Sequence, residues 1–137
     1  MSSVAKQTSG ATRIEKDSMG QLAVPVDAQW GAQTQRAVNN FAFSDLAMPA
    51  AFVRALGLIK HAAASANQSL ELIDEEIAVA IQKSAQEIID GQHVSQFPID
   101  VFQTGSGTSS NMNANEVIAK LASDQSGLAV HPNDHVN

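Results

Sequence analysis

The 137-residue sequence contains no cysteine and few basic residues. Without cysteine the chain cannot form a disulfide or a thiolate metal site, and it is compatible with a cytoplasmic environment. Eight lysines and arginines stand against fourteen acidic residues, which gives a formal net charge of -6. This balance argues against nucleic acid or an anionic membrane as the main partner.

Long hydrophobic runs are absent as well. No apolar stretch approaches the roughly 18 residues that a membrane helix needs, and the N-terminus has no apolar signal core. We therefore expect a cytoplasmic protein that does not enter a membrane. The length and a hydrophobic content of 44% suit a single globular domain, and no Pro/Gly-rich linker divides it.

The first part of the chain predicts little regular structure. Residues 1–11 are small and polar and lack periodicity, so we expect a flexible tail, followed by one domain over residues 12–137. Short apolar stretches on either side of 17-DSMG-20 predict a small β-hairpin that Pro25 ends. Residues 27–43 predict a loop that leads into a short helix.

Three longer helices are expected after this point. Residues 49–70 carry apolar side chains at helical spacing, with Pro49 in the first turn. The apolar stripe of this helix comprises Phe52, Leu56, Ile59, Ala63, Ala66 and Leu70. Asp74 is a suitable N-cap for a second, antiparallel helix with a stripe of Ile77, Ala80, Ile81, Ala85 and Ile88, and Gly91 is its stop signal. A third helix should begin near Ser109 or Ser110, which completes a mainly α fold with a small N-terminal hairpin.

The stretch 102-FQTGSGTSSNMNANEV-117 combines glycines, hydroxyls and asparagines with almost no charge. The third helix begins inside it, and the first turn of a helix has free backbone N–H groups and a dipole that favour an anion. Further donors could come from Ser106, Thr108, Ser109, Ser110, Asn111 and Asn113. The chemistry suits a small carboxylate, because the Gly-Lys-Ser/Thr of a Walker loop is missing. A glycine-rich connection whose serines only cap the helix would explain the same residues.

The segment 131-HPNDHVN-137 holds two histidines four residues apart. This is the spacing of two metal ligands on one helix face, but Pro132 interrupts such a helix and no third ligand is evident. Asn133 and Asp134 after a proline also fit a plain turn. We therefore expect no metal site here, and we expect His61 and His93 at the surface.

Together these motifs resemble the class II fumarate hydratases of the fumarase/aspartase superfamily. The resemblance rests on 104-TGSGTSSNMNANEV-117 and 131-HPNDHVN-137, and it extends to 13-RIEKDSMGQLAVP-25, 30-WGAQTQRAVNNF-41 and 97-FPIDVFQTGSGT-108. Aspartases, the nearest relatives of that family, typically have Gly-Gly-Ala-Gly-Thr in place of the first motif's Thr-Gly-Ser-Gly-Thr, and Asn-Pro-Asn-Asp in place of His-Pro-Asn-Asp. Both differences favour the fumarase side.

The resemblance implies the reversible hydration of fumarate to L-malate by a homotetramer, without a metal or organic cofactor. By position in the motifs, Ser106, Gly107 and Thr108 would bind the substrate. A second dicarboxylate site would comprise His131, Pro132, Asn133 and Asp134. The resemblance assigns no catalytic residue within this chain.

The chain also departs from the family pattern. The family's Ser-Ser-Asn-Asp segment, central helical bundle and mobile serine loop would follow Asn137, so we expect this chain alone to be inactive. Some members have an arginine shortly before the second motif, where this chain has 126-SGLAV-130. From Gly91 onward Lys120 is the only basic residue besides histidine, so further cations would come from elsewhere. An aspartase-like ammonia lyase domain and a non-catalytic helical binding or scaffolding module remain as alternatives.

Overall fold

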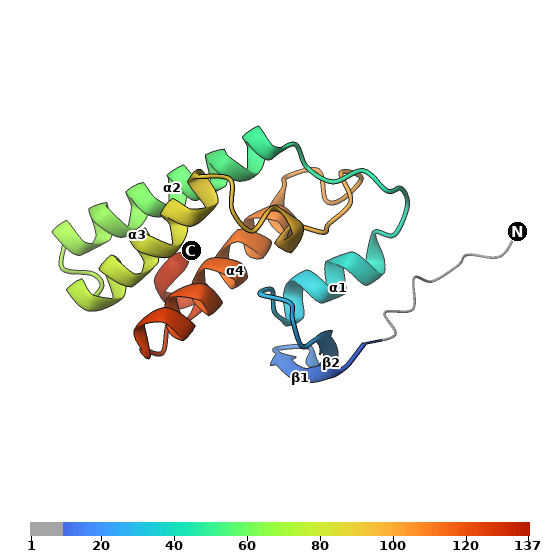
Figure 1. Cartoon of the computed structure of the whole chain (residues 1–137), viewed down its shortest axis with the longest axis horizontal. Helices are drawn as coiled ribbons and strands as arrows, with labels where there is room; N and C mark the ends of the chain where they lie inside the picture. The colour runs from blue at the N-terminus through green and yellow to red at the C-terminus, as the bar shows by residue number, and fades with distance from the viewer. Residues whose placement is uncertain (1–9) are drawn as a thin grey trace, which may run out of the picture.

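The computed structural model describes residues 10–137, which form a mainly helical domain with one small antiparallel sheet (Figure 1). This architecture confirms the predicted fold class. Of the expected tail, residues 1–9 lie outside the described residues. In chain order the elements are β1 (Thr12–Asp17), β2 (Gly20–Pro25), α1 (Ala32–Asn40), α2 (Ala50–Ser69), α3 (Glu75–Ile89), η1 (Val94–Gln96), α4 (Thr108–Ser126) and η2 (Pro132–Val136).

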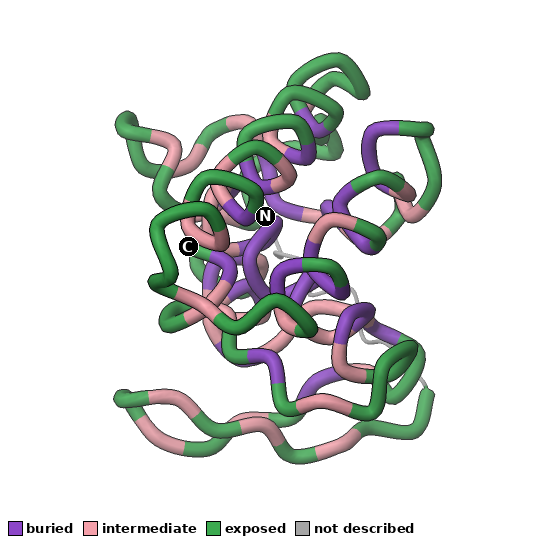
Figure 2. The backbone as a smooth tube through the Cα atoms, turned by 90° about the vertical axis from the view of Figure 1, so that its left-hand side faces the viewer, coloured by how far each residue is buried: buried purple, intermediate pink, exposed green. Residues whose placement is uncertain are grey.

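The strands β1 and β2 form the expected hairpin, with Thr12 paired to Pro25 and Asp17 to Gly20. Along most of both strands, half-buried positions alternate with exposed ones, as Figure 2 shows for the hairpin at the lower edge of that view. One face of the hairpin therefore rests on the domain. The carbonyl of Ala11, the last residue of the expected tail, accepts the N–H of Val26 at 3.1 Å and so extends the hairpin by one contact.

Two arginines fasten the hairpin to the rest of the domain. The guanidinium of Arg13 donates to the backbone carbonyl of Pro25 at the end of β2 and to three carbonyls in the loop that follows, those of Val26, Ala28 and Trp30. Arg36 on α1 makes a bidentate contact with the carboxylate of Asp17, at 2.8 and 2.9 Å. Such paired, charge-assisted hydrogen bonds fix orientation as well as distance. The hairpin is thereby held against the start of α1.

The helices α2 and α3 lie antiparallel, and α4 packs beside them (Figure 1). The predicted stripe of α3 is confirmed, since its members Ala80, Ile81, Ala85 and Ile88 are buried. Gly91 follows the end of this helix with a φ of 84°, a conformation that suits glycine. Helix α4 begins one residue before the predicted Ser109. Within residues 10–137 none of the helices combines the length and apolarity that a membrane crossing requires.

The predicted stripe of α2 is largely wrong. Phe52 and Ile59 are 38% and 58% exposed. The buried positions are instead Val53, Gly57, Lys60 and Ala64, and Pro49 is the N-cap. Gly57 decides which face of α2 contacts α3, because a Cβ at this position would lie 3.2 Å from side-chain atoms of Ile88 and Ile89 on α3. An alanine-rich helix packs closely through its smallest residues, so its larger apolar side chains lie beside the contact.

The two histidines expected at the surface are both half-buried. His93 lies in the loop after α3, and its Nε2 is 2.7 Å from the Glu87 carboxylate. The other oxygen of that carboxylate accepts the side-chain amide of Gln125 on α4. The loop after α3 is thereby tied to two helices.

A carboxylate on α4 joins this helix to α1. Glu116 is 8% exposed and accepts the backbone N–H groups of Gly31, Gln33 and Thr34 at 3.0, 2.9 and 2.9 Å. The N-cap residue of α1 is Gly31, which offers no side-chain cap. Glu116 therefore satisfies the free amides of α1 from 85 residues away in sequence, at the end where the helix dipole favours a negative charge.

We predict that Gly31→Ala destabilises the domain. A Cβ at this position would lie 3.0 Å from Oε1 and 3.1 Å from Cδ of Glu116, so it would force the carboxylate away from the amides. The expected loss is about 1–3 kcal/mol of unfolding free energy, measured by urea denaturation. Gly105→Ala is the matched control, because nothing lies within 4 Å of a Cβ there. Equal urea midpoints for the two variants would contradict the crowding.

We also predict that the contact between Asp17 and Arg36 makes stability sensitive to acid. The hydrogen bond from Arg36 is the main cause that holds the pKa of Asp17 below its ordinary value of 3.8. The folded protein therefore takes up this proton less readily than the unfolded chain, so the stabilisation is complete above pH 3.8 and is lost as the pH falls through the lowered pKa.

The variant Asp17→Asn should accordingly be less stable at neutral pH and should lose less stability on acidification, as measured by urea midpoints on both sides of pH 3.8. The exposed Asp27 provides the control variant Asp27→Asn. A pH profile of Asp17→Asn that parallels the parent protein would count against this coupling.

Candidate functional site

The glycine-rich segment leads directly into α4, as the sequence predicted. Gly107 is the N-cap of α4 and has a φ of 73°, a left-handed conformation that favours glycine. Its N–H donates to the carbonyl of Thr104, and its own carbonyl accepts the N–H of Asn111, both at 3.0 Å. Because glycine has no side chain, no N-cap side chain covers the first N–H groups of α4.

Hydroxyl groups surround this helix start. The hydroxyls of Ser106 and Thr108 are 2.8 Å apart, and both residues are exposed. The hydroxyls of Thr104 and Ser109 are 3.5 Å apart. A hydroxyl has one proton to donate, so in the Ser106 and Thr108 pair one group donates to the other, and the acceptor keeps its proton for a ligand. The structure thus brings the predicted residues Ser106, Gly107 and Thr108 together at one exposed point.

Two of the other predicted donors are used inside the protein. Ser110 is buried, and its N–H and its hydroxyl both donate to the side-chain oxygen of Gln103 at 3.0 Å. Asn113 is 1% exposed and donates its amide to the carbonyl of Gln96 at 2.9 Å. The prediction that these two side chains could serve a ligand is therefore wrong. Their contacts fix the position of the loop on α4.

Asp100 anchors the other end of the loop. Its carboxylate accepts the N–H of Phe102 at 2.8 Å and the N–H of Ser44, and its backbone pairs with Ala47 in an isolated β-bridge. Burial raises the pKa of Asp100, but these N–H donors outweigh burial and hold the pKa below its ordinary value. A charged carboxylate therefore fastens the loop to the segment before α2.

His131 is the N-cap of the short turn η2. The ring atom Nδ1 of His131 accepts the backbone N–H groups of Asn133 and Asp134 at 3.3 and 3.2 Å. The backbone N–H of His131 donates to Nδ1 of His135 at 2.9 Å. The Asp134 carboxylate also lies 3.2 Å from His131 Nδ1, a contact that needs a protonated ring nitrogen. The two amide contacts need an unprotonated Nδ1, so in this geometry Nε2 is the ring nitrogen that can donate.

The turn η2 begins at Pro132 and leaves His131 outside, so the prediction that no continuous helix spans His131 and His135 is confirmed. Across residues 10–137, no three side chains among His, Asp and Glu gather in a way that could hold a metal ion.

The end of the chain lies against α4. The side-chain oxygen of Asn137 accepts the amide groups of Asn111 at 3.1 Å and Asn115 at 3.2 Å. The amide of Asn111 is therefore also engaged within the protein. Since Asn111 lies one turn after Gly107, these contacts bring the second motif close to the start of α4.

A cavity of about 620 Å³ separates the hairpin from α4. His131, Pro132 and Asn133 form part of its wall, and the start of α1 forms another part. Lys16 and Trp30 line it as well, which the sequence did not indicate because these residues are more than 100 positions away from the His131 turn. Ser106, Gly107 and Thr108 do not line this cavity. The cavity therefore lies at the His131 turn and does not include the glycine-rich loop.

Comparison with known proteins identifies the family. A family model described as "Lyase" matches residues 20–137. The class II fumarate hydratase of Halobacterium salinarum is 60% identical over 130 residues, which cover 91% of this chain and 28% of that protein. Fumarate hydratase class II 2 of Pseudomonas aeruginosa is 61% identical over 126 residues, which cover 92% of this chain and 28% of that protein. The chain thus spans little more than a quarter of the length of these curated relatives.

Solved structures show the same likeness. A crystal structure of the class II fumarase from Schistosoma mansoni matches with a TM-score of 0.90 and 41% identity, over 93% of this chain and 28% of that one. A fumarate lyase:delta crystallin from Brucella melitensis, bound to cobalt, matches with a TM-score of 0.88 and 50% identity, over 93% of this chain and 29% of that one. On the sequence match and the shared fold together, the chain belongs to the lyase family and is similar over nearly its whole length to class II fumarate hydratases.

Proposed function

We propose that residues 12–137 are the N-terminal domain of a fumarate hydratase, which reversibly adds water to fumarate to give L-malate. The observation that carries the proposal is the start of α4, where the N-cap glycine offers no side chain, beside the exposed hydroxyls of Ser106 and Thr108. Backbone N–H groups at a helix start, together with hydroxyl donors, suit a small carboxylate. The same stretch lies within the region that is 60% identical to a fumarate hydratase.

The chemistry of the reaction explains why neutral donors are useful at this point. In the direction from malate to fumarate, a base removes a proton from the carbon next to a carboxylate, and negative charge develops on that carboxylate. Donors already directed at the carboxylate stabilise this charge without reorganising. In our proposal Thr108 Oγ1 and the N–H groups of Thr108 and Ser109 provide these donors, and Ser106 orients the Thr108 hydroxyl through its 2.8 Å contact. We assign no proton-abstracting base to residues 10–137.

We assign a second dicarboxylate site to His131, Pro132, Asn133 and Asp134. Three of these residues line the cavity of about 620 Å³, which has the size of a small-molecule site. The free Nε2 of His131 and the amide of Asn133 are suitable donors to a carboxylate.

The rest of the active site would come from sequence outside these residues. The matched region covers only 28% of the length of these relatives. A dianionic substrate also needs cations, and Lys120 is the only lysine or arginine from Gly91 onward. We propose that further segments and neighbouring subunits of a cytoplasmic homotetramer supply the cations and the base, without a metal or organic cofactor.

An aspartase-like ammonia lyase is the second candidate. Thr104-Gly105-Ser106-Gly107-Thr108 and the histidine of His-Pro-Asn-Asp favour the hydratase, and a parallel assay with aspartate separates the two reactions. A non-catalytic binding or scaffolding module would turn over neither substrate.

In a protein that extends past Asn137 with the rest of the lyase sequence, we predict that Thr108→Val lowers kcat/KM for L-malate by about 100-fold. Valine keeps the shape of threonine but removes the hydroxyl donor, and losing one such donor costs on this order in known enzymes. The absorbance of fumarate measures the rate. Thr104→Val is the matched control, since Thr104 is an exposed threonine in the same loop. This variant should lower kcat/KM by no more than a few-fold. Normal turnover by Thr108→Val would show that the Thr108 hydroxyl is not part of the active site.

We further predict that the purified 137-residue chain alone shows no hydratase activity in the same assay. The loop provides donors but no assigned base, so the chain lacks a component that the reaction needs. The longer protein at equal concentration is the positive control. Malate formation by the 137-residue chain would show that the site is complete within it.

A further inference from the structure

A second hollow of the domain is a groove of about 550 Å³ between the first half of α3 and the end of α4. Its floor is apolar, because the buried side chains of Ala80 and Ala122 and the half-buried side chain of Leu128 line it. Val79 lines the groove as well and is 53% exposed. The groove therefore leaves apolar surface in contact with water.

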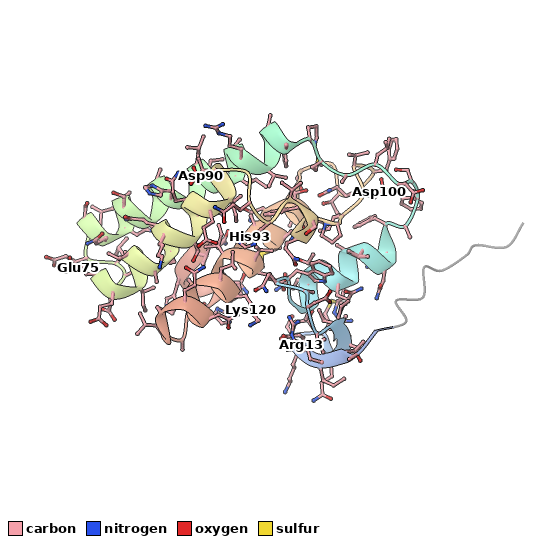
Figure 3. The ribbon with its side chains drawn as sticks, in the orientation of Figure 1. Arg13, Glu75, Asp90, His93, Asp100 and Lys120 are labelled. Atoms are coloured by element: carbon pink, nitrogen blue, oxygen red, sulfur yellow. The ribbon has the colours of Figure 1, made fainter. Side chains whose placement is uncertain are left out.

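This groove lies at the end of the domain formed by the turn between α2 and α3. Figure 3 labels Glu75, one of its lining residues, at the left end of the domain, away from Arg13 on the hairpin. Neither the glycine-rich loop nor the His131 turn contributes to its lining. The groove is therefore not accounted for by the two proposed carboxylate sites.

Charged residues stand at both ends of the part of α3 that lines the groove. Glu75 and Glu76 occupy the first turn of the helix, Lys83 lies two turns further on, and all three are exposed. None of these three side chains makes a hydrogen bond or an ion pair with any of residues 10–137. Glu87, the acid one turn after Lys83, is in contact with His93 instead. The groove thus has uncommitted negative charge at one end and uncommitted positive charge at the other.

The order of these residues makes the surface complementary to itself. Val79 comes four residues after Glu75 and four before Lys83, so the three side chains form one ridge, with a charge about 6 Å along the helix on either side of the valine. If two such helices cross in opposite directions at Val79, the acidic end of each meets the lysine of the other. A two-fold contact requires such self-complementarity. Ridges of this four-residue spacing also interdigitate in the commonest mode of helix packing.

We propose that this groove is a self-association surface, which binds a second copy of this chain through an antiparallel contact between the two α3 helices. Val79 of each copy enters the apolar groove of the other, where the small side chains of the floor leave room for it. Glu75 and Glu76 of each copy pair with Lys83 of the other. Since few residues take part, we expect a weak dimer with a Kd between about 10 µM and 1 mM. The inference does not depend on the proposed function.

Sedimentation equilibrium of the 137-residue chain tests this association directly. At about 0.15 M salt, the repulsion between two copies of net charge -6 is screened beyond about 8 Å, whereas contacts within the groove persist. We expect a monomer–dimer equilibrium. The methyl resonances of Val79 and Leu128 should shift with protein concentration, whereas those of Ile59, exposed on α2, should not. This measurement needs no substitution and therefore does not depend on the folding of a variant.

A substitution at the centre of the contact tests the apolar part. Val79→Asp should raise the dimer Kd at least about 10-fold, because each of the two copies loses a valine that the contact buries. Ile59→Asp is the matched control, since Ile59 is also a β-branched residue on a helix and is similarly exposed, at 58% against 53%. Its dimer Kd should equal that of the parent chain.

Charge reversal tests the two ends of the groove. Lys83→Glu and the double variant Glu75→Lys/Glu76→Lys each place like charges opposite one another in a self-pair, so each should raise the dimer Kd at least about 10-fold. An equimolar mixture of the two variants restores opposite charges at both ends. We expect a mixed dimer in this mixture that is at least as tight as the parent dimer.

The proposal is overturned if the parent chain stays monomeric up to about 1 mM, as it would if the groove served a different partner. It is also overturned if Val79→Asp associates like Ile59→Asp, or if the mixture of oppositely charged variants associates no more tightly than either variant alone. None of these outcomes bears on the hydration of fumarate, because Ser106, Gly107 and Thr108 lie outside the groove. Conversely, a longer protein without hydratase activity would leave the sedimentation result unchanged.

Discussion

The arrangement of the domain depends on one buried carboxylate. Glu116 on α4 accepts three amides at the start of α1, a helix whose N-cap is a glycine. Glu116 is only 8% exposed, and its burial is tolerated because three N–H donors and the positive end of a helix dipole surround the carboxylate. Gly31 leaves the space that the carboxylate occupies. The hairpin is then fixed through α1, by Arg36 and Asp17, so the position of the cavity wall also follows from this contact.

Helix α4 gives order to the rest of the site because it buries polar side chains as well as apolar ones. Asn113 holds the carbonyl of Gln96 in the loop after α3, and Asn115 holds the side chain of Asn137 after η2. Buried amides with defined partners fix a single geometry, since each lost contact would leave a polar group unsatisfied. The same helix carries the donor loop at its start and Lys120 along its side. Both proposed carboxylate sites are therefore positioned by the same helix.

The sequence predicted those features that depend on neighbours in the chain. The apolar stripe of α3 and the start of α4 next to Gly107 follow from local spacing, and the structure confirms them. The face of α2 could not be predicted in this way, because Gly57 allows a close approach that a count of large apolar residues does not reveal. Asn113 looked like a ligand donor for a similar reason, since its partner lies 17 residues away. Nothing in the local pattern distinguished Glu116 from a solvent-exposed acid on a helix.

The separation of neutral donors from cations has a consequence for the proposed enzyme. A lysine attracts a carboxylate about equally before and during the reaction, so it tightens binding without accelerating the chemical step. Hydroxyl and N–H donors at a helix start gain most when charge on the carboxylate increases, as it does when the neighbouring carbon loses a proton. The loop of Ser106, Gly107 and Thr108 is of the second kind, and Lys120 in the cavity is of the first. In the proposed enzyme the loop would therefore be the part of this domain that contributes to catalysis, and the cavity at the His131 turn would hold a carboxylate without reacting with it.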